Sequence, residues 1–201
     1  MRIWTLGGLC VALALATLVG FACGSDGGSN GGTETPEAAT PRVLPEPTIT
    51  GNRYTFPGRG YAVDIPEGWT TDPNSVAAGS LVVDSFFSSE EVDGVQTNIT
   101  VSCEENPTVS TSEYVEQRLE TIRQLDARDL ERSGTLEVAG VPAEMVQYSL
   151  VREDVTVGKV DVMFVSGPCA WTISLTAAPS ALDAAKATLN AFLSSFTILQ
   201  E

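Results

Sequence analysis

Histidine is absent from this chain of 201 residues, and lysine occurs only twice, at Lys159 and Lys186. Histidine is the commonest general base and metal ligand in proteins, so its absence excludes Ser-His-Asp and Cys-His catalysis. Neither lysine stands in a Ser-x-x-Lys arrangement, so Ser-Lys catalysis has no support either. We therefore expect a protein that is not an enzyme and that has no metal centre and no cofactor.

Basic residues are also scarce, with 11 Lys and Arg against 26 Asp and Glu, which gives a formal net charge of −15. A field of this sign repels phosphate backbones, so the composition argues against a nucleic-acid partner. It also opposes adhesion to anionic lipid headgroups. If the protein is held at a membrane, the charge therefore favours a covalent lipid as the anchor.

One long apolar run stands at the start of the chain, from Ile3 to Ala22, and Cys23 follows it. This stretch resembles a bacterial lipoprotein signal peptide, in which the cysteine after a short lipobox is acylated and becomes the first residue. Ala22 matches the family pattern, whereas Gly20-Phe21 departs from the aliphatic and small residues expected there. The resemblance implies a signal peptide over residues 1–22, lipidation of Cys23 and attachment to the outer face of the cell membrane.

An uncleaved transmembrane helix is the alternative, because about 20 apolar residues suffice to span the hydrocarbon core of a bilayer. Three glycines in the run weigh against this alternative. In both cases the positive charge of Arg2 favours a cytoplasmic location for the start of the chain, so residues 24–201 are expected outside the cell.

Residues 23–50 show no apolar periodicity. The first half interleaves glycine with serine and asparagine, and the second half contains Pro36, Pro41, Pro45 and Pro47. These compositions are typical of a flexible coil followed by a stiffer, extended spacer. With about 27 residues and a reach of about 30 Å, this segment is expected to be a tether without a fold of its own.

The four cysteines have different expected roles. Cys10 lies inside the leader and Cys23 is the candidate for lipidation, which leaves Cys103 and Cys169 in the exported domain, where disulfides persist. Both fall at apolar positions of their predicted strands, so neighbouring strands would place their Cα atoms within the roughly 4.4–6.8 Å that a disulfide needs. Such a bridge would stabilise the fold by roughly 3–4 kcal/mol. Two buried free thiols are the alternative.

Alternation of apolar and polar residues predicts the strands of a domain over residues 51–201. It is strictest in Val95–Cys103, which follows the turn signal Asp93-Gly94, and it indicates one buried and one solvated face. The other predicted strands are Tyr61–Ile65, Leu81–Phe87, Leu136–Val138, Ala143–Val151, Val155–Val165 and Cys169–Thr176. The positions opposite the apolar face in the two cysteine-containing strands are Gln96, Asn98, Thr100, Ser102, Ala170, Thr172, Ser174 and Thr176.

Two helices are predicted from apolar residues that recur every three or four positions. The first follows Ser110 and Glu113, which have capping-box spacing, and is expected to stop by Ser133-Gly134. The second follows Pro179-Ser180, with Ser180 and Asp183 again at capping spacing, and leads into a short extended segment. The order strands, helix, strands, helix predicts an α+β fold with an antiparallel sheet packed by helices.

Three stretches carry a resemblance to the PsbP-like family: Gly60–Trp69, Val138–Ala143 and Leu193–Ile198. This family includes the extrinsic photosystem II protein and bacterial lipoproteins of the LpqN and DcrB types, and the stretches frame about 140 residues here, nearly the whole domain. The resemblance implies a central antiparallel sheet between helices, an α/β/α sandwich. It also implies a mostly non-enzymatic role as an accessory subunit, a binding module or an envelope protein.

One acidic cluster, Glu90, Glu91 and Asp93 with Glu104 and Glu105, offers oxygen ligands of the kind that calcium prefers. Its spacing matches no EF-hand loop, and a polar hairpin tip needs such residues for solubility. We therefore expect a solvated turn without a metal ion.

These observations favour a membrane-tethered, extracytoplasmic module that binds an envelope protein or a small ligand. One alternative is a structural accessory subunit of a cell-envelope complex. Another is a hydrolase that uses carboxylates alone, although the sequence places no two of them about 5–9 Å apart in a cleft. A lined apolar pocket would favour small-ligand binding, and a convex surface would favour the accessory role.

Overall fold

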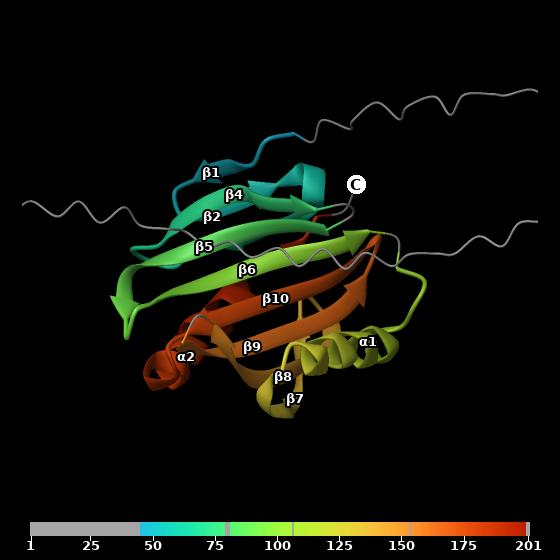
Figure 1. Cartoon of the computed structure of the whole chain (residues 1–201). Helices are drawn as coiled ribbons and strands as arrows, with labels where there is room; N and C mark the ends of the chain where they lie inside the picture. The colour runs from blue at the N-terminus through green and yellow to red at the C-terminus, as the bar shows by residue number, and fades with distance from the viewer. Residues whose placement is uncertain (1–44, 79–80, 106, 153, 200–201) are drawn as a thin grey trace, which may run out of the picture. The chain divides into compact units, whose positions relative to one another are not determined.

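The computed structural model describes residues 45–78, 81–105, 107–152 and 154–199 (Figure 1). The leader, Cys10, Cys23 and the tether as far as residue 44 lie outside these residues. Two antiparallel sheets and two α-helices make up the described part of the chain, which confirms the α+β class.

A seven-stranded antiparallel sheet forms the centre of the domain, with the strand order β4-β5-β6-β10-β9-β8-β7. Its strands are β4 (Thr70–Ala78), β5 (Leu81–Val92), β6 (Val95–Glu105), β7 (Arg128–Val138), β8 (Val141–Arg152), β9 (Val155–Ser166) and β10 (Cys169–Ala177). The strands β6 and β10 are far apart in the sequence but hydrogen-bond to each other in the middle of the sheet. The two cysteine-containing strands are therefore neighbours.

A small second sheet has the order β1-β2-β3-β11. It consists of β1 (Thr48–Thr50), β2 (Arg53–Phe56), β3 (Tyr61–Asp64) and β11 (Thr197–Ile198), with a 3₁₀ turn at Pro57–Arg59. The pairing of β11 with β3 brings the end of the domain back to its beginning. The strand β1 also means that regular structure begins three residues inside the expected tether.

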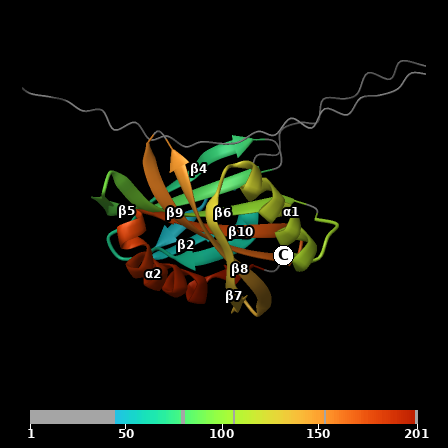
Figure 2. The same cartoon turned by 60° about the horizontal axis from the view of Figure 1, so that its bottom comes forward.

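The two helices, α1 (Thr111–Gln124) and α2 (Leu182–Ser195), lie on opposite faces of the large sheet (Figures 1 and 2). Helix α1 covers β8 and β9 on what we call the outer face, which Figure 1 shows toward the viewer. Helix α2 and the small sheet cover the opposite, inner face, where α2 contacts both β10 and β3. The inner face is therefore covered over its central strands, whereas much of the outer face over β5, β6 and β10 is not covered by a described helix.

Aromatic side chains fill the space between the large sheet and the small one. Trp171 of β10 packs edge-on against Tyr61 of β3 and against Phe196, and Phe86 of β5 packs against Phe192 of α2. All of these side chains are almost completely buried, so they contribute the largest apolar areas of the core. Gly158 belongs to the same face, where an added Cβ would lie 2.7 Å from Cδ2 of Leu182.

The amphipathic stripe of α1 builds a second core on the outer face. The predicted residues Val115, Leu119 and Ile122 are buried against β8 and β9. Their buried partners on the sheet are Val146, Tyr148, Leu150, Met163 and Ala170. The capping box at its start is also present, since Ser110 Oγ accepts from the Glu113 amide and the Glu113 carboxylate accepts from the Ser110 amide.

Several local expectations differ from the structure. The first helix ends at Gln124 rather than near Ser133-Gly134, and the short strand predicted at Leu136–Val138 is an eleven-residue edge strand that starts at Arg128. The missed part of β7 is mostly exposed and interrupted by two register shifts, so its sequence lacks apolar alternation. The strands β1, β2 and β4 were also not predicted.

The prediction that the Ser180 side chain caps the last helix is wrong. A 3₁₀ turn over Pro179–Ala181 precedes α2, and the N-cap residue Ala181 provides no side-chain hydrogen bond. The Ser180 hydroxyl instead donates to the Asp93 carboxylate in the turn between β5 and β6. That turn has the predicted residues, with Asp93 at φ 51° and Gly94 at φ 77°, as expected for a tight hairpin whose two central residues are left-handed.

Candidate functional site

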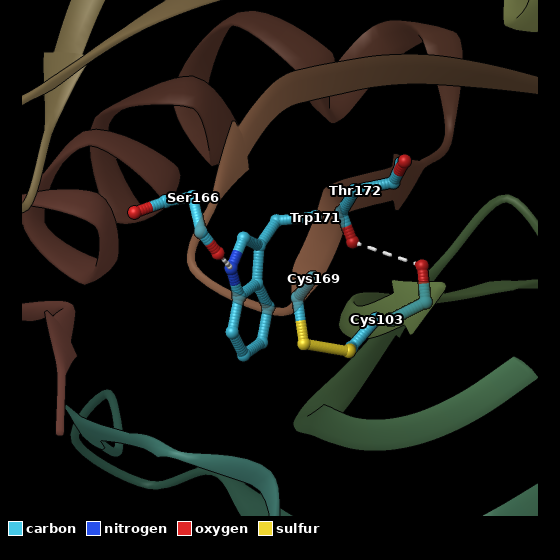
Figure 3. Close-up of a disulfide and its surroundings, with 6 residues drawn as sticks. Cys103, Ser166, Cys169, Trp171 and Thr172 are labelled. Carbon is cyan, nitrogen blue, oxygen red and sulfur yellow. Dashed lines mark hydrogen bonds between the residues drawn. A yellow bond between two sulfur atoms is a disulfide. The ribbon is translucent and has the colours of Figure 1, made fainter. Parts of the chain in front are cut away.

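A disulfide joins Cys103 of β6 to Cys169 of β10, with the Cα atoms 5.2 Å apart (Figure 3). Both cysteines are buried on the inner face, as their apolar position in the strands predicted. Trp171 lies beside the bridge and donates its indole N–H to the Ser166 carbonyl oxygen at 3.3 Å. The bridge therefore ties the two central strands together within the aromatic core.

The predicted acidic turn consists largely of exposed side chains. Glu90 and Glu91 are exposed, and Asp93 accepts the hydrogen bond from Ser180. In the part of the chain that the structure describes, no group of three or more Cys, Asp and Glu side chains could hold a metal ion. Among the same residues no helix has the length and apolar character needed to cross a membrane.

The uncovered part of the outer face contains a block of neutral polar side chains on the two central strands. The backbone register places Asn98 opposite Thr176, Thr100 opposite Ser174, and Ser102 opposite Thr172. We call these six residues the polar block. Ser174 and Thr172 are buried, and the other four are partly exposed, so the block combines a floor of fixed hydroxyls with accessible side chains.

Helix α1 forms a polar wall at one end of this block. The Tyr114 hydroxyl lies 2.9 Å from Thr172 Oγ1 and donates to Glu104 Oε1 at 3.2 Å. Arg118, one turn further along α1, lies 3.9 Å from the same Glu104 oxygen. Burial is the main cause that raises the pKa of Tyr114 to about 12, so this phenol remains a neutral hydrogen-bonding group.

Asp161 lies next to the block on β9, where the register places it opposite Ser174. Its side chain faces the outer side of the sheet but is only 1% exposed. Tyr148 donates to Oδ2 at 2.9 Å, whereas Oδ1 has no hydrogen-bond partner among the described residues. Burial, and then the negative charge of Asp161, raise the pKa of Tyr148 far above its ordinary value.

Two hollows lie near these residues. One, of about 240 Å³, is lined by Tyr114, Gln117, Glu104 and the loop that leads into α1. The other, of about 260 Å³, lies on the inner side between β8 and the start of α2, and its lining includes Asp129 and Asp183. Both are smaller than the roughly 300–1,000 Å³ of typical small-molecule pockets.

The sequence predicted part of this site. Strand alternation placed Asn98, Thr100 and Ser102 on one face, and Thr172, Ser174 and Thr176 on one face of another strand. It did not show that the two strands are adjacent, which requires long-range pairing. Asp161 was missed, although an acidic residue within the apolar run Val160–Val165 is a signal that could have identified it.

No protein-family model and no curated protein sequence matches this chain. Among solved structures, the solution structure of cyanobacterial PsbP (CyanoP) from Synechocystis sp. PCC 6803 matches with a TM-score of 0.55 and 18% identity, over 73% of this chain and 91% of that one. The fold is PsbP-like.

Two further solved structures also match this chain. A protein from Bacteroides thetaiotaomicron VPI-5482 matches with a TM-score of 0.51 and 13% identity, over 76% of this chain and 50% of that one. LpqN of Mycobacterium tuberculosis, described as involved in cell envelope biogenesis, matches with a TM-score of 0.44 and 13% identity, over 67% of this chain and 86% of that one. Identities in this range show a shared fold alone.

Proposed function

We propose that this protein is an exported lipoprotein, held at the outer face of the cell membrane by acylated Cys23, and that its PsbP-like domain is a non-enzymatic binding module. The disulfide between Cys103 and Cys169 carries the proposal. A buried structural disulfide is typical of proteins that fold in an oxidising, extracytoplasmic compartment. It also accounts for both cysteines of the domain, which leaves Cys23 available for lipid.

The chemistry of the domain supports a binding role rather than catalysis. The chain contains no histidine, and all four of its tyrosines have a pKa raised above the ordinary value of 10. None of these phenols therefore supplies a phenolate nucleophile or base near neutral pH. The polar block and its α1 wall instead present hydrogen-bonding groups at fixed positions, which is what a recognition surface requires.

The anchoring part of the proposal is tested by comparing Cys23→Ala with Cys10→Ala in the native host. We expect the Cys23→Ala protein to retain its leader and to lose metabolic labelling with a fatty acid. Cys10→Ala changes a cysteine that the cleaved leader removes, so its labelling should equal that of the wild type. Equal labelling of all three proteins, or none in the wild type, would overturn lipidation of Cys23.

The binding part is tested by cross-linking on intact cells from a photoreactive side chain at Asn98, with Glu120 on the exposed side of α1 as the control position. A discrete adduct from position 98 that is absent from position 120 supports a binding module that uses the polar block. Adducts of equal yield from both positions would contradict the assignment of that surface. Addition of protease outside the cell should remove the domain, and full protection would contradict the outer-face location.

A further inference from the structure

The side chains of the polar block indicate the class of ligand that suits it, an inference that rests on the proposed binding function. All six residues are neutral, and each offers a hydroxyl or an amide. Asn98, Thr100, Ser102 and Thr176 are partly exposed. Such a surface matches a ligand that presents several neutral hydrogen-bonding groups at short intervals.

Beside the block, Asp161 provides the strongest sign of a missing partner. Its carboxylate is almost completely buried, yet Oδ1 receives no hydrogen bond from the described residues. A buried carboxylate oxygen without a donor is costly, and natural proteins nearly always provide one from protein, water or ligand. The Oδ1 atom is closed to solvent, so an incoming donor reaches it only after neighbouring side chains move aside. Lys159, two residues earlier on the same face, is partly exposed.

An unmet donor lies on the α1 side of the same region. The Arg118 Nε atom is buried and has no acceptor among the described residues, while the guanidinium is held only at 3.9 Å from Glu104. A hydroxyl group both donates and accepts, so a ligand with several hydroxyls can supply a donor to Asp161 and an acceptor to Arg118.

We propose that the polar block, with Asp161 and Arg118 at its margin, binds a neutral polyhydroxylated ligand of the carbohydrate class. An anionic ligand is disfavoured by the net charge of −15. A cationic ligand would meet Arg118 and Lys159 at the margin of the block, where Asp161 and Glu104 are the carboxylates, and the six block residues themselves carry none. A polyol gains hydrogen bonds from the four partly exposed residues of the block without either penalty.

The test uses the mature protein, isotopically labelled, in detergent micelles, titrated with the methyl glycosides of glucose, galactose and mannose. Nuclear magnetic resonance shifts are followed at the Asn98 side-chain amide and at the backbone amides of β6 and β10. At least one glycoside is expected to shift these signals in a saturable manner. Spermidine serves as the cationic comparison and should leave them unchanged.

Two pairs of variants separate binding from folding. Asp161→Asn keeps the shape of the side chain. It should weaken binding about tenfold, because one charge-assisted hydrogen bond to the ligand is lost. The exposed Asp183→Asn on the other side of the sheet is its control. Thr100→Val, with Thr135→Val on the edge strand as its control, tests the block without altering a charge. Unchanged melting temperatures establish that each variant is folded.

Absence of saturable shifts with all three glycosides would overturn the carbohydrate assignment, as would equal binding by Thr100→Val and wild type. Saturable binding of spermidine at the block would do the same and would indicate a cationic ligand. These results leave the proposed function intact if the photoreactive residue at position 98 still captures a discrete partner on cells. Failure of the proposed function would instead appear as unlabelled Cys23 or as loss of position-specific cross-linking.

Discussion

At the scale of single residues, Asp84 connects the two sheets. It lies in the middle of β5 and is 1% exposed, yet Arg59 Nη1 lies 2.6 Å from its Oδ1 atom. Tyr61 of β3 donates to Oδ2 at 2.6 Å, and the Arg59 guanidinium also lies over the Phe56 ring. Both partners come from the small-sheet side, so this buried ion pair fixes the small sheet against the large one.

Removal of one member of this pair leaves the other charged and buried. Arg59→Met is therefore expected to lower the free energy of unfolding by about 3–5 kcal/mol. Lys186→Met is the matched control, because Lys186 pairs with the exposed Asp183 and such surface pairs contribute about 0–1 kcal/mol. Urea unfolding followed by Trp fluorescence measures both changes. A loss in Arg59→Met no larger than in Lys186→Met would contradict this role for Asp84 and Arg59.

At the scale of secondary-structure elements, the two helices begin in different ways. Ser110 and Glu113 form a complete capping box at the start of α1, where the two hydrogen bonds from Ser110 lower the pKa of the exposed Glu113 carboxyl. Helix α2 has the same sequence spacing at Ser180 and Asp183, but Pro179 starts a 3₁₀ turn that shifts the helix start to Leu182. Spacing alone could not distinguish the two, because the partner of Ser180 is Asp93, 87 residues away.

Ser110→Ala should destabilise the protein by about 1 kcal/mol, since it leaves an amide at the start of α1 without its acceptor. Ser112→Ala, at an exposed position inside the same helix, is the control. Because the folded pKa of Glu113 is below its ordinary value of 4.5, its contribution is present above that pH and is lost as the pH falls below it. The difference in melting temperature between wild type and Ser110→Ala should therefore shrink in acid. Equal melting temperatures at neutral pH would contradict the capping role.

At the scale of the whole molecule, all four tyrosines lie in the two cores that hold the sheets and helices together. Burial is the largest cause that raises the pKa of Tyr54, Tyr61, Tyr114 and Tyr148 above 10. A raised folded pKa means that the stabilising contribution is fully present below pH 10 and is lost as the pH rises through the folded values. The folded protein should therefore unfold cooperatively in alkali.

Ultraviolet absorbance near 295 nm, which reports tyrosinate, tests this directly. In denaturant the four phenols should titrate near pH 10, whereas in native buffer tyrosinate should appear only at higher pH and together with the loss of near-ultraviolet circular dichroism. The folded pKa of Tyr114 is about 12. A tyrosine that titrates reversibly near pH 10 while the domain remains folded would contradict the described cores.

The sequence predicted the elements better than their assembly. Val95–Cys103 and Cys169–Thr176 alternate so strictly that their faces could be assigned, and the stripes of both helices were recognisable. The second sheet could not be predicted, because β1 and β11 are only three and two residues long. The polar block needed the pairing of β6 with β10, and this pairing depends on contacts between residues about 70 positions apart.

The proposed attachment of an exported, disulfide-bonded, PsbP-like domain to a membrane through Cys23 can be tested in one measurement. Intact mass spectrometry of the protein purified from native membranes without reducing agent tests it most directly. We predict a chain that begins at Cys23, carries acyl groups on that residue, and is two hydrogens lighter than its fully reduced form because Cys103 and Cys169 are joined. A mass that corresponds to an unmodified chain beginning at Met1, or to two free thiols in the domain, would contradict it.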